Sequence, residues 1–162
     1  MTRMATISVL ALITLSGCGK SGVPQEAQKT ADVLTGDAKG SAADNPMCKL
    51  FSPDEAAAYI GEPVNAGRNS GMGMGCQWTA KDNEGDVMVV VVPARYTERP
   101  TLGAGFREVP EAGKDGFVVP ELGGWAAGAV AGDSFVKVSV AGSKASDANA
   151  LALLKETIKR RP

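Results

Sequence analysis

Apolar residues recur with the spacing of a helix near residue 55. Ser52 and Glu55 have the spacing of a capping box, Pro53 fits the first helical position, and Gly61 supplies a stop. The apolar side chains between these signals share one face: Ala56, Tyr59 and Ile60. The pattern therefore predicts a short amphipathic helix that ends just before Gly61.

A second helical pattern covers residues 146–160. Its apolar stripe consists of Leu151, Leu154 and Ile158. Four basic residues gather toward its C-terminal end, where they complement the helix dipole: Lys155, Lys159, Arg160 and Arg161. We interpret this cluster as a solvated helix end, with contact to an anionic lipid or glycan as the alternative.

Between the two helices, short apolar runs separated by turn signals predict strands. Residues 76–80 and 86–92 are joined by a polar turn of hairpin length. Residues 125–130 and 135–140 form a second predicted hairpin, and residues 115–119 form a short strand. We therefore expect a sheet that is built largely from antiparallel hairpins.

The expected strands differ in how many faces they bury. Residues 86–92 show no polar alternation, which predicts a central strand with both faces covered. In residues 135–140 the valines point one way, whereas Lys137 and Ser139 point the other. One face of the sheet should therefore be wet at this strand.

Residues 94–113 predict no single structure, because Pro100 and Pro110 interrupt what would otherwise be a helix around residues 102–108. The remaining elements define the fold class. It is α+β, with an antiparallel β-sheet covered by a short N-terminal helix and an amphipathic C-terminal helix.

The first residues of the chain have the pattern of a bacterial export signal. Arg3 precedes an uncharged apolar run, residues 5–15, which has the length of a signal-peptide core and is too short to span a bilayer. Residues 15–18, Leu-Ser-Gly-Cys, resemble the lipobox, whose cysteine receives diacylglycerol. We therefore expect a lipoprotein signal peptide at residues 1–17, cleavage before Cys18, and anchorage through acyl chains on that residue.

The predicted mature chain divides into a tether and one domain. Residues 18–46 are rich in Gly, Ala, Ser, Asp and Lys and carry too few apolar side chains to form a core, which predicts a flexible tether. Residues 47–162 are expected to form a single α+β domain. Resemblance to Gram-negative lipoproteins implies that Gly19, in place of an Asp, carries no signal for inner-membrane retention, which favours the outer membrane facing the periplasm in a Gram-negative cell.

The three cysteines divide between two expected roles. With Cys18 assigned to lipid, Cys48 and Cys76 remain as an even pair in an oxidising compartment, which favours a structural disulfide. Met72, Met74 and Cys76 also form a soft ligand set of the kind Cu(I) prefers, provided that Cys76 is reduced. The competing interpretation is a flexible loop whose methionines pack on the sheet, and we expect no bound metal.

Composition narrows the classes of function. The sequence contains no histidine, which excludes Ser-His and Cys-His nucleophiles and most catalytic zinc sites. Its formal net charge of −1 gives no broad attraction for nucleic acid, and no phosphate-binding fingerprint is present. We therefore expect no enzyme activity, no catalytic residues, no cofactor and no nucleic-acid partner.

Several motifs in order carry a family resemblance. Residues 48–56 (CKLFSPDEA), 60–64 (IGEPV) and 76–78 (CQW) precede two sheet segments, residues 113–117 and 132–138, and the C-terminal helix. Over residues 47–160 the chain resembles a group of bacterial lipoprotein domains of unknown function that is best populated in actinobacteria. The resemblance implies a paired Cys48 and Cys76 and an α+β sandwich-like domain, and it carries no catalytic residues.

Anchorage without evident chemistry favours a non-catalytic envelope lipoprotein that binds another envelope protein, a glycan or a lipid. Trp78 is expected in the core, whereas Trp125, flanked by glycine, is a candidate partner contact. One alternative is a histidine-free envelope hydrolase or transferase that uses Ser, Lys or paired carboxylates, for instance among Asp82, Glu84 and Asp86, although such a cluster is typical of a solvated turn. The other is a copper-binding or purely structural lipoprotein.

Overall fold

The computed structural model describes residues 42–100 and 104–161 of the chain. The predicted signal peptide and Cys18 lie outside the described residues, as does the predicted tether up to residue 41. Ordered structure is already present upstream of Met47, where the domain is expected to begin. The buried Asn45 side chain accepts a hydrogen bond from the Met47 N–H at 2.9 Å and donates one to the Gly75 carbonyl at 2.8 Å.

Seven strands, two α-helices and five 3-10 turns make up the described part of the chain. The α-helices are α2 (Pro53–Ile60) and α3 (Asp147–Arg160). The strands are β1 (Arg68–Ser70), β2 (Gly75–Thr79), β3 (Asp86–Pro93), β4 (Arg107–Glu108), β5 (Lys114–Glu121), β6 (Gly124–Ala131) and β7 (Ser134–Ala141). The turns are η1 (Ala42–Asp44), η2 (Pro46–Lys49), η3 (Gly71–Gly73), η4 (Ala94–Tyr96) and η5 (Pro110–Ala112).

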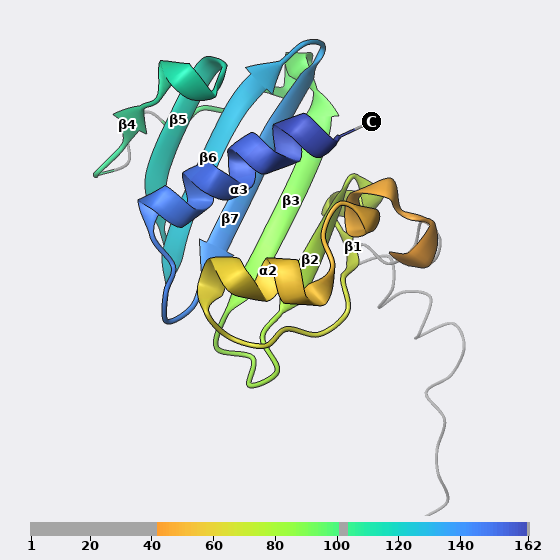
Figure 1. Ribbon diagram of the computed structural model, residues 1–162. Coiled ribbons are helices and arrows are strands. Elements are labelled where there is room, and N and C mark those ends of the chain that lie inside the picture. The colour runs from red at the N-terminus through yellow and green to blue at the C-terminus, as the bar shows by residue number, and fades with distance from the viewer. Residues whose placement is uncertain (1–41, 101–103, 162) are drawn as a thin grey trace, which may run out of the picture.

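The strands form one antiparallel sheet in the order β1-β2-β3-β7-β6-β5-β4 (Figure 1). Both predicted hairpins are present, as β2–β3 and β6–β7. The sequence did not predict the two edge strands, because β1 has three residues and β4 has two, too few to show an alternating pattern. A central sheet of hairpins is thus edged by short strands, which limits edge-to-edge pairing.

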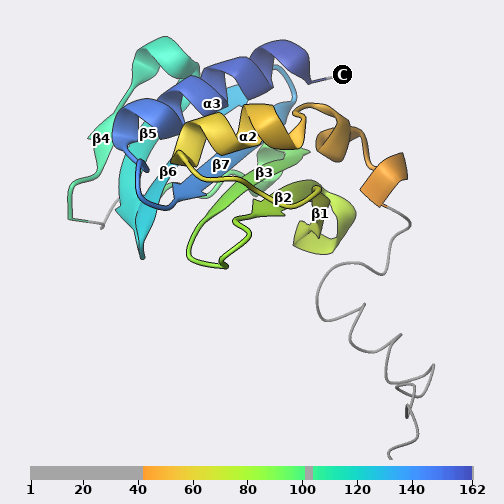
Figure 2. The ribbon, with the colours of Figure 1, turned by 60° about the horizontal axis from the view of Figure 1, so that its bottom comes forward.

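Both α-helices lie on the same face of the sheet, and the views agree that no α-helix of the described chain covers the other face (Figures 1 and 2). Helix α3 packs on β5, β6 and β7, and α2 packs on β3 and β7. We call the second face the helix-free face. None of the described helices is long and apolar enough to cross a membrane.

The end signals of α2 work as the sequence indicates. The Ser52 hydroxyl accepts a hydrogen bond from the Glu55 N–H at 3.2 Å, and the Glu55 carboxylate accepts one from the Ser52 N–H at 2.8 Å. Gly61 ends the helix in the left-handed region at φ 79°, where a side chain would be strained. The capping box and the glycine stop therefore set both ends of this short helix.

Helix α3 begins at the predicted Ser146 cap but buries a different stripe from the one expected. Leu154 is buried as predicted, whereas Leu151 and Ile158 are only half-buried at the margins. The residues that complete the buried stripe have helical spacing as well: Ala150, Leu153 and Thr157. Thr157 can face the core because its hydroxyl donates a hydrogen bond to the Leu153 carbonyl at 2.7 Å.

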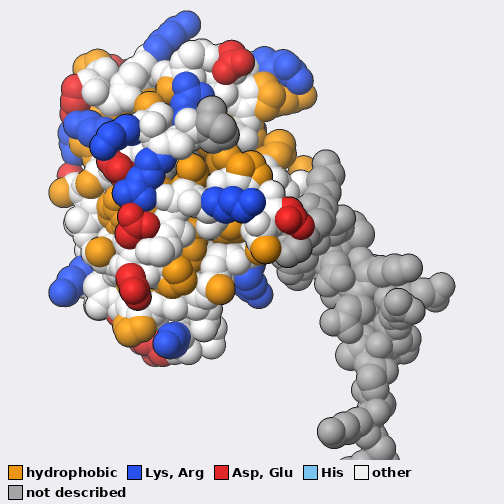
Figure 3. Space-filling view, turned by 45° about the vertical axis from the view of Figure 1, so that its right-hand side comes forward, with side chains coloured by type: hydrophobic (Ala, Val, Ile, Leu, Met, Phe, Trp, Pro, Cys, Tyr) orange, Lys and Arg blue, Asp and Glu red, His pale blue; other side chains and the backbone are white. Residues whose placement is uncertain are grey.

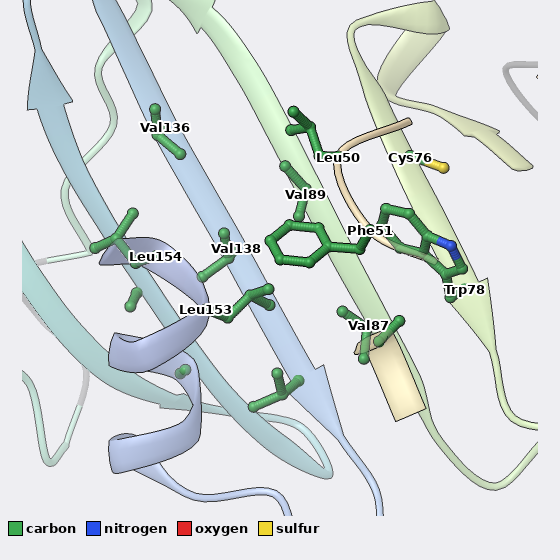
Figure 4. Close-up of a cluster of buried hydrophobic side chains, with 14 of the residues drawn as sticks. Leu50, Phe51, Cys76, Trp78, Val87, Val89, Val136, Val138, Leu153 and Leu154 are labelled. Atoms are coloured by element: carbon green, nitrogen blue, oxygen red, sulfur yellow. The ribbon is translucent and has the colours of Figure 1, made fainter. Parts of the chain in front are cut away.

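The main core lies between the helices and the sheet (Figure 4). Phe51, in the segment before α2, and Trp78 on β2 have their rings edge to face, with centroids 6.1 Å apart. Trp78 is only 1% exposed, which confirms the predicted core role. The predicted disulfide joins Cys48 to Cys76 beside this cluster and ties η2 to β2.

The prediction that both faces of residues 86–92 are covered is wrong. Strand β3 is interior to the sheet, between β2 and β7, and Val87 and Val89 are fully buried on its helix side. On its helix-free side Val90 and Val92 are only half-buried. The absence of polar alternation therefore indicates that both faces of this strand are apolar. The α-helices of this chain cover only one of them.

Candidate functional site: a groove on the helix-free face

The helix-free face carries an apolar groove along β3. Its volume is about 720 Å³, within the roughly 300–1,000 Å³ of typical ligand sites. We define the groove by the residues that line it: Met72, Met74, Val90, Val92, Tyr96, Glu98, Arg99, Pro100, Phe135 and Lys137. The sequence places these residues on the η3 loop, on β3 and β7, and on the segment after β3.

One wall of the groove is the methionine loop between β1 and β2. Met72 lies in η3 with a left-handed backbone (φ 56°), and the residue is 65% exposed. Met74 is 39% exposed, and its carbonyl accepts a hydrogen bond from the Val91 N–H at 3.1 Å, which fixes the loop against β3. Two long, polarisable side chains are thus held over the floor that Val90 and Val92 form.

The opposite wall adjoins a second, smaller hydrophobic core in which three phenylalanine rings stack. Phe117 lies between Phe106 and Phe135, with ring centroids 5.9 Å and 6.4 Å away, respectively. A Cβ at Gly128 would come within 2.8 Å of the Phe117 ring and 3.0 Å of the Phe135 ring. Only glycine therefore lets these rings lie flat on the sheet beside the groove.

The segment after β3 closes one end of the groove. Tyr96 is 56% exposed, and the Arg95 guanidinium lies 4.7 Å from the centre of its ring. Glu98, Arg99 and Pro100 follow as lining residues. This segment belongs to residues 94–113, whose structure the sequence left open, and it forms η4 rather than a regular strand or helix.

Two basic side chains at the groove are engaged by carboxylates. Lys137 Nζ lies 2.7 Å from Glu121 Oε1, and Arg99 Nη2 lies 2.7 Å from Glu108 Oε1. All four side chains are partly exposed, between 28% and 69%, so the two ion pairs contribute little to stability. The Arg99 Nε is buried and has no hydrogen-bond partner within the described ranges.

The residues that the sequence singled out are not brought together in the groove. Trp125 lies on β6 on the helix side of the sheet, where it is half-buried and packs against the main core. Its role as a partner contact stays a prediction. Cys76 is fully buried in the disulfide, so of the proposed copper ligands only the Met72 and Met74 thioethers face the groove.

The acidic residues of the β2–β3 turn point to different partners. Asp82 Oδ1 accepts a hydrogen bond from the Glu84 N–H at 3.0 Å, which stabilises the turn. Asp86 Oδ2 accepts one from Gln77 Nε2 at 2.7 Å, across the β2–β3 pair. Among residues 42–100 and 104–161, no group of three or more metal-binding side chains of the His, Cys, Asp and Glu types lies together.

The basic end of α3 joins the two helices. Arg160 donates hydrogen bonds to Glu156, Glu55 and the Leu50 carbonyl, at 2.7, 2.8 and 2.8 Å, and its guanidinium lies 4.7 Å from the centre of the Phe51 ring. The helix end is therefore more than a solvated basic cluster. On the side of the molecule seen in Figure 3, basic and acidic side chains are interspersed with hydrophobic ones.

These contacts lower the pKa values of the two glutamates that Arg160 contacts. The hydrogen bond from the Ser52 N–H, and then the one from Arg160, hold the pKa of Glu55 below its ordinary value of 4.5. The hydrogen bond from Arg160 likewise lowers the pKa of Glu156. Both carboxylates therefore stay ionised further into the acid range than free glutamates.

Sequence reasoning missed the groove residues outside the methionine loop. Tyr96 and Arg99 lie in the proline-interrupted segment, whose conformation local patterns do not determine. The available signal was the run of valines in β3, since an apolar strand facing away from the helices needs a cover or a ligand. The wet face expected from Lys137 and Ser139 holds for those half-exposed residues but not for Phe135, which lies on the same side of β7 and is buried.

The fold and the groove define a class of protein: a disulfide-linked α+β domain with one seven-stranded antiparallel sheet, helices on a single face, and an apolar groove on the other. The chain belongs to the family described as "protein of unknown function (DUF3558)", which matches it over residues 13–160. No curated protein and no solved structure matches this chain.

Proposed function

We propose that this chain is a lipoprotein of the bacterial cell envelope, anchored in the membrane through Cys18, and that its domain is a non-catalytic binding module. The module binds another envelope component, a protein, a glycan or a lipid, through the groove on the helix-free face. In a Gram-negative cell we place it on the outer membrane, facing the periplasm.

The observation that carries the binding role is an apolar groove on a sheet face that has no helical cover. The domain buries Val87 and Val89 under its helices but leaves Val90 and Val92 at the groove floor half-exposed. Met72 and Tyr96 add large exposed apolar surface at the walls. Contiguous exposed apolar surface of this kind is typical of ligand and partner sites.

Two features of the chain support an envelope location. The motif at residues 15–18 has the pattern that precedes a lipid-modified cysteine, after an apolar run of signal-peptide length. The Cys48–Cys76 disulfide fits a compartment outside the reducing cytoplasm. Acyl chains on Cys18 would hold the module at a membrane surface.

Anchorage is tested by expressing the full chain in bacteria with a labelled fatty acid. We expect label on the wild-type chain and on Leu122→Ser, none on Cys18→Ser, and an intact mass that begins at acylated Cys18. An unlabelled wild-type chain that keeps residues 1–17 would contradict the proposal.

Binding through the groove is tested by photo-crosslinking in intact cells. A photoreactive amino acid replaces Met72 or Tyr96 in the groove, and the matched control replaces Leu122, an exposed hydrophobic residue of the β5–β6 turn outside the groove. We expect a defined adduct from both groove positions and none from position 122. Identical adduct patterns at all three positions would contradict a groove-specific role.

A further inference from the structure

We propose that the groove binds a single acyl chain that ends in a carboxylate, that is, a free fatty acid. This inference rests on the proposed function, because it names the ligand class of the same groove. Three observations support it: the lining is apolar, the backbone groups of the floor are already paired within the sheet, and two basic side chains at the groove already hold carboxylates.

The lining suits a flexible methylene chain. Val90 and Val92 form the floor and Phe135 one wall, and none of these side chains has a polar atom that would require a directional partner. Met72 and Met74 form the other wall, and unbranched thioether side chains adapt their shape to ligands of different length. Binding to this part of the lining is therefore driven by the burial of apolar ligand surface.

An extended peptide fits this floor poorly. Strand β3 pairs with β2 on one side and β7 on the other, with Val90 opposite Gly75 and Lys137. The backbone groups of the floor are thus used within the sheet, and strand addition requires a free edge. Amide groups of an extended peptide would lie against this floor without partners, which is costly, whereas a methylene chain has none.

Charge complementarity places the carboxylate at the basic side chains. Lys137 and Arg99 line the groove. Lys137 holds the Glu121 carboxylate at 2.7 Å, and Arg99 holds the carboxylates of Glu108 at 2.7 Å and Asp115 at 3.6 Å. A ligand carboxylate can replace such a group, because partly exposed ion pairs contribute little and are exchanged at little cost. The one acidic lining residue, Glu98, is exposed and can stay in water.

The test uses the full chain with Cys18→Ser, the Cys48–Cys76 disulfide oxidised and no detergent. Saturated fatty acids that lengthen by two carbons at a time are titrated calorimetrically, below their aggregation concentrations. We expect Kd to fall with each added methylene, by up to about fourfold, until the groove is full. The alcohol of equal length should bind up to about fivefold more weakly than the acid, because it lacks the charge.

Matched variants separate the groove from the apolar run at residues 5–15, which every variant retains. Val90→Asp places a charge on the floor and should weaken binding by tenfold or more, and Leu122→Asp should leave it unchanged. If Val90→Asp fails to fold, Met72→Asp on the exposed loop tests the same wall. Lys137→Gln should reduce the difference between acid and alcohol while the alcohol binds as before.

Each contrary outcome has a defined meaning. Affinity independent of chain length, or equal loss in Leu122→Asp and Val90→Asp, overturns the fatty-acid assignment. If fatty acids do not bind but crosslinking at Met72 captures one envelope protein, this inference is wrong and the proposed function stands. If neither fatty acid nor specific adduct is found, both are wrong.

Discussion

The two faces of β3 carry the same residue type in different surroundings. Val87 and Val89 are fully buried beneath the helices, whereas Val90 and Val92 form the half-exposed floor of the groove. Hydrophobicity alone therefore does not distinguish a strand face that packs within the chain from one that stays open. Within β3, the helix side contributes its valines to the main core, and the helix-free side contributes its valines to the floor of the groove.

The largest expected contrast is a truncation on each face. Trp78→Ala removes a buried indole that contacts Phe51 and should lower the free energy of unfolding by about 3–5 kcal/mol. Val90→Ala removes two half-exposed methyl groups and should cost about 1 kcal/mol or less. Urea unfolding followed by circular dichroism measures both, and equal losses would show that the two faces do not differ in this way.

Loss of the disulfide should have the second-largest effect on stability, because the disulfide ties η2 to β2 beside the main core. Cys48 and Cys76 are 28 residues apart, and replacing both with serine should lower the free energy of unfolding by about 3–4 kcal/mol. The wild-type chain unfolded in the presence of reductant serves as the control and should match the double variant. If reductant left the urea midpoint unchanged, the disulfide would not stabilise this face.

A change in the backbone of the methionine loop should have a smaller effect on stability, and of opposite sign. Met72 adopts a left-handed conformation that favours glycine, so Met72→Gly should raise the free energy of unfolding by up to about 1 kcal/mol. Met74 has an ordinary right-handed backbone (φ −89°), and Met74→Gly should instead lower it by about 0.5–1 kcal/mol. Stabilisation together with weaker fatty-acid binding would indicate that strain is retained at the groove for binding. Loss of stability in both variants would contradict this interpretation.

How much of the fold the sequence predicts depends on how local the signals are. The capping box at Ser52 and Glu55, the two central hairpins and the Cys48–Cys76 pairing follow from neighbouring residues or from pair counting, and the structure contains all of them. The buried stripe of α3 was only partly predicted. Residues 150–158 carry apolar side chains on more than one face of the helix. Packing against the sheet, which the local pattern does not specify, determines which of these side chains are buried.

The candidate site was harder to predict because it is assembled from separate elements. Met72 and Met74 drew attention for metal chemistry, but the structure places them in an apolar wall. Phe135 was recognised only as a strand residue, and Tyr96 not at all. Their convergence depends on the pairing of β3 with β7 and on the path of residues 94–100, which no local pattern specifies.

The smallest expected effect concerns the outer surface of the helix side, where Arg160 links α3 to Glu55 at the start of α2. The pKa of Glu55 is lower in the folded protein than its ordinary value, mainly because of the Ser52 N–H and then Arg160. A carboxylate with a lowered folded pKa stabilises the fold above its unfolded pKa, and that contribution is lost as the pH falls through the folded pKa.

Glu55→Gln removes the charge together with the hydrogen bond from Arg160, while the glutamine side-chain oxygen can still accept the Ser52 N–H hydrogen bond. At about pH 7 the variant should unfold at slightly lower urea than the wild type, and the gap should close as the pH falls below the lowered pKa of Glu55, because the wild-type carboxylate is then neutral as well. Ser52→Ala removes a hydrogen bond without removing a charge, so its loss should be nearly equal at both pH values. A gap between Glu55→Gln and the wild type that stayed constant while the wild-type Glu55 carboxylate became protonated would mean that the Arg160 link does not hold the helices together through charge.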